Sequence, residues 1–301
     1  MIIVGEALVD LVPEQDGRLD PRAGGSARNV AIAAARLGAE VSYVGGLSAD
    51  GFGRRMRAEF VDEGVDVSCS PVLDAPTPLA VVDLDEAGQA EYRFHLAETA
   101  ALALSSDDLA CLRGDEPLHV SLGAITLATP RVGDALVALL ASHAALKSID
   151  PNVRPAFVTD PAAETERLDA AVSLVDLVRC SDEDLATLRP GTAVAEIADG
   201  WREAGAAAVV VTRGDGGAEA WTASGHVAVT APTVDVVDTV GAGDTFGAAL
   251  LTALVEAGAT DRAGLEVLDT GDWEAALSFA ARAAAVTVSR RGADPPRRAE
   301  V

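Results

Sequence analysis

Short apolar runs alternate with amphipathic segments along most of this 301-residue chain. The apolar runs predict strands, which are expected at 1–4, 40–44, 118–121, 146–149, 177–178 and 207–212. The amphipathic segments predict helices, which are expected at 26–37, 52–63, 131–144, 164–174, 193–204, 242–257 and 273–288. This alternation predicts an α/β fold in which a doubly wound, mainly parallel sheet is flanked by helices.

Residues 72–103 depart from this alternation. Leu79 to Leu84 and Glu91 to Phe94 are short β-rich runs on either side of the turn Asp85-Glu86-Ala87-Gly88, which predicts a hairpin. No helix of useful length separates them, so we interpret this stretch as a small β insert outside the main sheet. Residues 11–23 are polar and irregular, and another hairpin is predicted at 218–229. Without a long linker or a repeat, the chain is expected to form a single domain over 1–301.

The chain is strongly acidic, with 23 Lys and Arg residues against 47 Asp and Glu residues and a net charge of −24. Such a surface repels nucleic-acid phosphates and anionic membranes, so neither is an expected partner. An excess of acid more often serves solubility or adaptation to salt. A site for an anionic ligand must therefore be built locally, from backbone amides, a helix N-terminus or a metal ion.

The three cysteines, Cys69, Cys111 and Cys180, lie far apart in the sequence and show no spacing typical of zinc ligands. Their odd number argues against a disulfide framework and favours isolated thiols in a reducing cytoplasm. The N-terminal MIIVGEALVD lacks the basic leader and long apolar run of a signal peptide. No run approaches the ~18 apolar residues that a membrane span needs. We therefore expect a cytoplasmic protein.

The sharpest chemical signal is the sequence DTVGAGDTF at 238–246. Gly241 and Gly243 flank Ala242 where a loop enters a helix, so the backbone can approach a ligand closely and unpaired amides can point at an anion. Asp244 falls in the first helical turn, where the helix dipole favours a carboxylate. An anion hole beside a fixed carboxylate suits phosphoryl transfer to an alcohol. By spacing alone, an ordinary glycine-rich turn is equally open.

A second signal is GGSARN at 24–29. Gly24 and Gly25 precede a helix whose first turn carries Asn29, and an amide side chain there can donate to and accept from sugar hydroxyls. Taken alone, the segment favours a plainer interpretation, in which the glycines form a turn, Ser26 caps the helix and Asn29 is merely polar.

Together these segments resemble the two signatures of the ribokinase, or PfkB, family of carbohydrate kinases. Other phrases also resemble that family in order along the chain, namely GEALVDLVP, VGGLSADGFG, DPNVRP, VTRGDGG and SRRGADPP. The resemblance runs from about residue 2 to residue 296. GEALVDLVP and DPNVRP look most similar to the fructokinase and 2-keto-3-deoxygluconate kinase branches.

The resemblance implies ATP-dependent phosphorylation of a sugar hydroxyl, with Asp244 as general base. Amides of the anion hole would come from Gly241, Ala242 and Gly243. The sugar would be held by Asp10, Gly24, Gly25 and Asn29, with Arg154 near the sugar or the transferred phosphate. The nucleotide site would be lined by Thr212, Gly214 and Gly217. The inserts at about 11–23 and 72–103 would form a β lid over the sugar.

The resemblance also implies Mg²⁺ as a cofactor. The family often carries an Asn-x-x-Glu segment near the metal-bound water, and the matching stretch here is Ser181-Asp182-Glu183-Asp184. Asp184 is therefore the candidate for a contact to the metal through water. Many relatives bind a monovalent cation such as K⁺ beside the anion hole, and backbone oxygens near Asp238, Val240 and 290–292 are candidates for it.

The substrate prediction depends on Leu96. In relatives that act on fructose or 2-keto-3-deoxygluconate, the matching lid strand often carries an arginine near its end, which reaches the sugar. Leu96 can offer only apolar contact, and a buried carboxylate without a cation is costly. A neutral sugar is therefore favoured over a sugar acid, with fructose as first choice and its primary hydroxyl as acceptor.

Other functions remain as alternatives. A 2-keto-3-deoxygluconate kinase, a ribokinase, a nucleoside kinase and a non-catalytic sugar or nucleotide sensor could share the fold. A dinucleotide-binding oxidoreductase is disfavoured, because the first strand meets only Val4-Gly5-Glu6-Ala7 and no G-x-G-x-x-G. A P-loop kinase is excluded, because Lys147 is the chain's only lysine and no P-loop motif surrounds it. Exposed lid edges favour a homodimer that pairs lid to lid.

Overall fold

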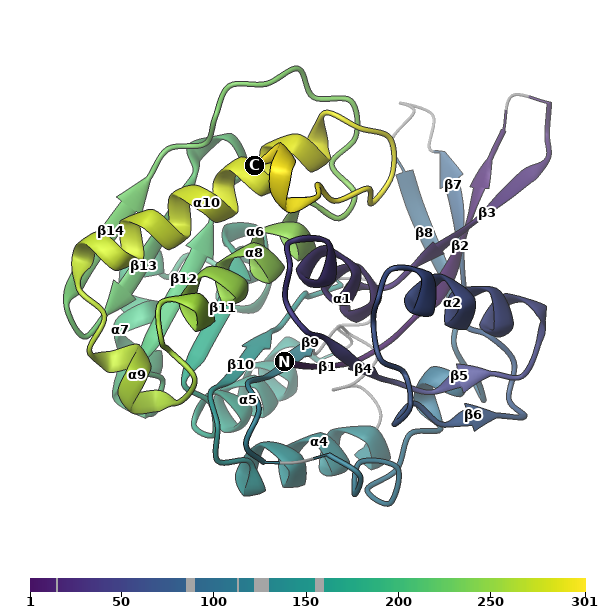
Figure 1. Cartoon of the computed structure of the whole chain (residues 1–301), viewed down its shortest axis with the longest axis horizontal. Coiled ribbons are helices and arrows are strands. Elements are labelled where there is room, and N and C mark those ends of the chain that lie inside the picture. The colour runs from purple at the N-terminus through teal and green to yellow at the C-terminus, as the bar shows by residue number, and fades with distance from the viewer. Residues whose placement is uncertain (15, 85–89, 113, 122–129, 155–159) are drawn as a thin grey trace.

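The computed structural model describes residues 1–14, 16–84, 90–112, 114–121, 130–154 and 160–301 (Figure 1). Its main sheet has eight strands in the order β14-β13-β12-β11-β10-β9-β1-β4. Their bounds are β1 (Ile2–Val4), β4 (Ser42–Val44), β9 (Leu118–Ser121), β10 (Lys147–Asp150), β11 (Leu177–Ser181), β12 (Ala208–Thr212), β13 (Ala218–Thr222) and β14 (Gly225–Val229). From β4 to β12 all neighbours pair in parallel, whereas β13 and β14 form the antiparallel hairpin expected at 218–229. The predicted mainly parallel sheet is confirmed.

Helices cover both faces of this sheet, as predicted. Their bounds are α1 (Ser26–Arg36), α2 (Gly51–Asp62), α4 (Pro130–Ser142), α5 (Pro161–Val172), α6 (Asp182–Leu188), α7 (Val194–Ala204), α8 (Ala242–Glu256), α9 (Arg262–Glu266) and α10 (Thr270–Val288). Alternation along β12 shows how the faces are divided. Val209 and Val211 pack with α4, α5 and α7, whereas Ala208 and Val210 pack with α8 and α10.

A separate four-stranded sheet stands beside α1 and α2 (Figure 1). It has the order β3-β2-β7-β8, formed by β2 (Leu8–Pro13), β3 (Leu19–Gly24), β7 (Leu79–Leu84) and β8 (Ala90–His95). The hairpin expected between Leu79 and Phe94 is present, while its turn at 85–88 lies outside the described residues. The expectation of irregular chain at 11–23 is wrong, because β2 and β3 pair antiparallel from Leu8↔Gly24 to Pro13↔Leu19. Pro21 made β3 hard to recognise from the sequence. A proline is tolerated there because β3 is an edge strand, whose outer side makes no backbone hydrogen bonds to a neighbouring strand.

The remaining elements are short. β5 (Leu47–Ser48) and β6 (Val72–Leu73) form a small parallel pair. Helices α6 and α9 were not expected, and β11 extends to Ser181, three residues beyond its predicted end. In the described ranges, no helix is long and apolar enough to cross a membrane. Helices α1 and α8, which lie far apart in the sequence, pack against each other.

Candidate active site

A cavity of about 530 Å³ opens where α1 and α8 begin and where β1, β10 and β11 end. The predicted site residues that line it are Asp10, Gly25, Asn29, Arg154, Asp184, Gly241, Gly243 and Asp244. Gly24 lines a neighbouring cavity of about 270 Å³ together with Asp10 and Asn29. Ala242 lies between the two lining glycines. Residues from both ends of the sequence therefore meet in one pocket.

The predicted nucleotide-binding residues lie outside this cavity. Gly214 and Gly217 belong to the turn that joins β12 to β13. Thr212 ends β12, and its hydroxyl accepts a hydrogen bond from Arg179, which does line the cavity. The proposed nucleotide contacts of these three residues remain predictions.

Asp244 is held by both of its carboxylate oxygens. It lies in the first turn of α8. Ser26 Oγ donates to Oδ1 at 2.7 Å, and Asn29 Nδ2 donates to Oδ2 at 2.8 Å. Both donors come from the first turn of α1, so the packing of α1 on α8 fixes where the carboxylate points. Each oxygen keeps a further lone pair for a hydroxyl in the cavity.

The turn before α8 is where the anion hole is predicted. Gly241 is the N-cap residue and has a φ of 77°. Of the three predicted anion-hole amides, that of Ala242 is already paired, because it donates to the carbonyl of Thr239 at 3.2 Å. Within the described part of the chain, the amides of Gly243 and Asp244 have no acceptor, as is usual for the first turn of a helix. Asp238 supports the turn, because its carboxylate accepts from the amides of Val240 at 3.0 Å and Gly292 at 2.8 Å. An anion can therefore meet unpaired N–H groups beside Asp244.

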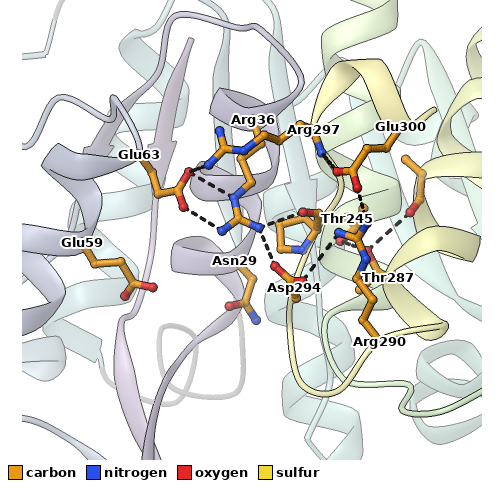
Figure 2. A network of polar contacts seen from close by, with 12 residues as sticks. Asn29, Arg36, Glu59, Glu63, Thr245, Thr287, Arg290, Asp294, Arg297 and Glu300 are labelled. Carbon is orange, nitrogen blue, oxygen red and sulfur yellow. Dashed lines mark hydrogen bonds and ion pairs between the residues drawn. The ribbon is translucent and has the colours of Figure 1, made fainter.

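Figure 2 shows the polar network that holds the loop at 290–294 against this turn. Arg36 of α1 donates to Glu63 at 2.6 Å and 3.1 Å and to Asp294 at 2.6 Å. These contacts keep Ala293 so close to Gly241 that a Cβ on Gly241 would lie 2.6 Å from that of Ala293. The network thus joins α1 to the loop that supports the anion hole.

A buried arginine lies next to the anion hole and was not predicted. Arg179 donates to Asp150 at 2.7 Å and to Thr212 at 2.7 Å. A Cβ on Gly243 would lie 3.0 Å from its guanidinium. Burial lowers the pKa of Arg179, but the charge and hydrogen bond of Asp150, together with the charge of Asp184, outweigh burial and raise the pKa on balance. A charged residue inside the apolar strand β11 was the signal that could have revealed it.

Arg154, which was expected near the sugar or the phosphate, lines the cavity but is exposed. Its guanidinium donates to Asn152 Oδ1 at 2.6 Å.

Two more carboxyl groups face the end of the cavity that lies toward β2. Burial raises the pKa of Glu6 to about 7 and that of Asp10 to about 6. Glu6 follows β1 directly, a position that sequence reasoning did not single out. With Asp244 they make this end of the cavity acidic, so it suits hydroxyl groups better than anions.

Both carboxylate oxygens of Asp184 already accept hydrogen bonds within the protein. Oδ2 accepts from the amide and hydroxyl of Ser181 at 2.9 and 2.8 Å, and Oδ1 accepts from the amide of Val153 at 2.8 Å. No group of three metal-ligating side chains occurs among the described residues. Mg²⁺ usually keeps several waters and binds through one or two carboxylates and substrate phosphates. Asp184 and Glu183, which also lines the cavity, fit such contacts through water.

Leu96 does not line the cavity, contrary to the expectation that it meets the sugar. Its side chain is buried among Leu8, Ala80 and Ala101. From the four-stranded sheet, Leu8 and Phe94 reach the cavity instead. Leu96 lies just beyond the end of β8, so alternation along the strand does not fix the direction of its side chain.

Comparisons with known proteins agree with this geometry. The family model for pfkB family carbohydrate kinases matches residues 1–299. The fructokinase of Rhizobium leguminosarum bv. trifolii is 36% identical over 261 residues, which cover 84% of this chain and 79% of that protein. The fructokinase of Salmonella typhimurium is 36% identical over 269 residues, which cover 88% and 87%.

Solved structures give the same result. Fructokinase from Xylella fastidiosa with bound ATP has a TM-score of 0.89 and 27% identity, covering 97% of this chain and 93% of that one. Fructokinase from Vibrio cholerae O395 with fructose, ADP and calcium ion bound has a TM-score of 0.84 and 29% identity, with the same coverage of 97% and 93%. The predicted family and fold are confirmed: this chain belongs to the pfkB family of carbohydrate kinases.

Proposed function

We propose that this carbohydrate kinase transfers the γ-phosphoryl group of ATP to a primary hydroxyl of fructose. The observation that carries the proposal is the placement of Asp244, whose carboxylate is fixed by two donors beside unpaired amides in one cavity. A general base and an anion hole at this separation are what transfer to an alcohol requires.

The geometry supports a division of roles. Asp244 accepts the proton of the sugar hydroxyl, whose oxygen attacks the γ-phosphorus while the bond from that phosphorus to the bridging oxygen breaks, so that ADP leaves and the sugar phosphate forms. The amides of Gly243 and Asp244 stabilise charge on the transferred group, and Arg179 adds positive charge behind them. Asp10 and Gly25 lie where the remaining sugar hydroxyls would bind. Mg²⁺ would neutralise phosphate charge near Asp184.

The acidity of the cavity supports a neutral sugar. Glu6, Asp10 and Asp244 all face the sugar end, and a sugar carboxylate placed there would meet like charge. The relatives above are named fructokinases, which supports fructose among neutral sugars. The aminoimidazole riboside kinase of Salmonella enterica, at 26% identity and a TM-score of 0.84, keeps ribosides as a second class to test.

The central experiment measures ATP consumption by the native protein and by Asp244→Asn. The panel contains fructose, ribose, 2-keto-3-deoxygluconate and nucleosides. We expect fructose to be preferred, and Asp244→Asn to lower turnover by ~10²–10⁴-fold with ATP binding kept. Asp199→Asn, on the exposed side of α7, is the matched control and should turn over normally.

The outcomes separate the alternatives. Turnover of Asp244→Asn within about threefold of the native protein would refute Asp244 as the general base, since loss of a general base lowers the rate far more than threefold. Preference for 2-keto-3-deoxygluconate, ribose or a nucleoside would refute fructose but keep the kinase. Binding of a sugar that does not require ATP and leads to no turnover would identify a non-catalytic sensor.

We further propose a homodimer formed through the four-stranded sheet, because its outer strands β3 and β8 are unpaired edges in the described chain. Light scattering should give the mass of two chains, and a monomer at all working concentrations would contradict this.

A cytoplasmic location is supported by three free cysteines. They are not all isolated, however, since Cys111 Sγ lies 4.0 Å from the carbonyl oxygen of Cys69.

A further inference from the structure

A chain of polar contacts leads from α2 through α1 to Asp244 on α8. Arg28 Nη2 donates to the carboxylate of Glu59, and Arg28 Nη1 donates to Asn29 Oδ1 at 2.9 Å. Asn29 Nδ2 then donates to Asp244 Oδ2 at 2.8 Å. Asn29 and Glu59 are both labelled in Figure 2, on the α1 and α2 side of the network.

Arg28 decides which way the amide of Asn29 faces. A guanidinium has only donors, so it can bind the amide oxygen but not the NH₂ group. Because Oδ1 is held by Arg28, the NH₂ group is turned toward Asp244. Without Arg28, the amide can rotate by half a turn and set its oxygen against the carboxylate of Asp244, which is repulsive.

Glu59 in turn keeps Arg28 in place as a cation. Arg28 is only 6% exposed, and a buried charge is costly unless it is paired. Burial lowers the pKa of Arg28, and the charge and hydrogen bond of Glu59 oppose that effect. The other oxygen of Asp244 is held by Ser26 and does not depend on this chain.

We infer that Arg28, supported by Glu59, is a positioning residue for the phosphoryl transfer. It acts through Asn29 to hold the carboxylate of Asp244 toward the acceptor hydroxyl. The inference rests on the proposed role of Asp244 as general base.

The test compares Arg28→Met with Arg28→Lys. In Arg28→Met the guanidinium no longer holds the Asn29 amide, so the hydrogen bond from Asn29 to the charged carboxylate of Asp244 is lost. We expect kcat to fall about tenfold, while KM for ATP stays within about twofold. Arg28→Lys keeps a cationic donor and should recover most of kcat. A structural role alone would lower the melting temperature of Arg28→Met without lowering kcat of the folded enzyme, and that result would overturn the inference.

Glu59→Gln and Glu256→Gln form a matched pair. Both remove a carboxylate that pairs with an arginine, but only Glu59 reaches Asn29 through its partner. Glu256 pairs with Arg298 at the end of α8 that lies away from Asp244. Glu59→Gln should lower kcat about threefold, as a weakened hydrogen bond does, and Glu256→Gln should not. Equal kcat in the two variants would contradict the inference. This pair also keeps the test open if Arg28→Met does not fold.

A double-mutant cycle with Asn29→Ala tests the route. If Arg28 acts through Asn29, Arg28→Met has no further effect on kcat in that background. An equal effect in both backgrounds would overturn the inference. If Asp244→Asn collapses turnover while Arg28→Met keeps kcat, only this inference fails; if Asp244→Asn keeps turnover, the proposed function itself fails.

Discussion

Replacing Gly241 with alanine tests the anion hole with the smallest possible change. Gly241 caps α8 with a φ of 77°, a left-handed conformation. The added Cβ would lie 2.6 Å from Ala293 Cβ and 3.0 Å from Ala293 Cα. Ala293 cannot easily retreat, because its neighbours Gly292 and Asp294 are held by Asp238 and Arg36.

Two penalties add in the Gly241→Ala variant. The left-handed conformation costs roughly 1–2 kcal/mol for a residue with a Cβ. Overpacking against Ala293 costs about 1–3 kcal/mol more. For a chain of this size, each kcal/mol lowers the melting temperature by about 1.5–2 °C. We therefore expect a clear loss of stability, measurable by thermal unfolding.

Gly241→Ala should also lose turnover, by a free energy comparable to its loss of stability. The turn relieves its overlap by moving, and the amides of Gly243 and Asp244 move with it. Misplacing a donor to the transition state costs about 10²–10³-fold in kcat. A coupled assay of ADP release, with sugar and ATP at saturation, measures this directly.

Gly258→Ala is the matched control, since Gly258 follows the other end of the same helix. It has a φ of 101° and no atom within 4 Å of an added Cβ. The helix of 15 residues places it roughly 20 Å from the site. It should lose stability but keep kcat. If Gly241→Ala also keeps kcat within about threefold, the anion-hole argument is refuted.

Three further predictions concern the metal, the base and pH. Excess chelator should abolish activity and added Mg²⁺ should restore it, because the phosphates of ATP need a counter-charge on a chain of −24; equal activity in chelator would contradict this. Ser26→Ala removes the donor to Asp244 Oδ1 and should lower kcat about tenfold, whereas Ser26→Thr keeps the hydroxyl and should recover it, as kinetics would show. Burial raises the pKa of Glu6 from 4.5 to about 7, so this carboxyl stabilises the folded state less as pH rises between those values. Glu6→Gln should therefore gain up to about 3 kcal/mol over the native protein between pH 4 and pH 8, and a pH-independent difference in melting temperature would argue against it.

Periodicity predicted the main sheet well, because its strands are buried on both faces and its helices have one apolar face. Periodicity failed where the composition of a segment did not indicate the structure that the segment adopts. Residues 11–23 look irregular because β2 and β3 are mostly only half-buried and contain proline, yet they pair along their whole length. Only the partner strand makes such a segment a strand, and a partner is not visible in a local pattern.

The site was predicted to a different extent for backbone and side chains. Glycine-rich turns before helices are local features, so spacing singled out Gly241, Gly243 and Asp244, but spacing alone left an ordinary turn equally open and the family resemblance supplied their roles. Arg179 and Ser26 could not be assigned, because their roles come from neighbours more than 30 residues away, such as Thr212 and Asp244. The prediction for Leu96 failed for a related reason, since Leu96 follows the end of β8 and its packing on Leu8, Ala80 and Ala101 comes from residues distant in sequence.

The contact between Ala293 and Gly241 has a consequence for biosynthesis. The loop at 290–294 supports the anion hole only after Arg36, near the start of the chain, has bound Asp294. We therefore expect a nascent polypeptide that ends before residue 294 to lack the support behind Gly241 and to turn over its substrates poorly even where its parallel sheet has formed.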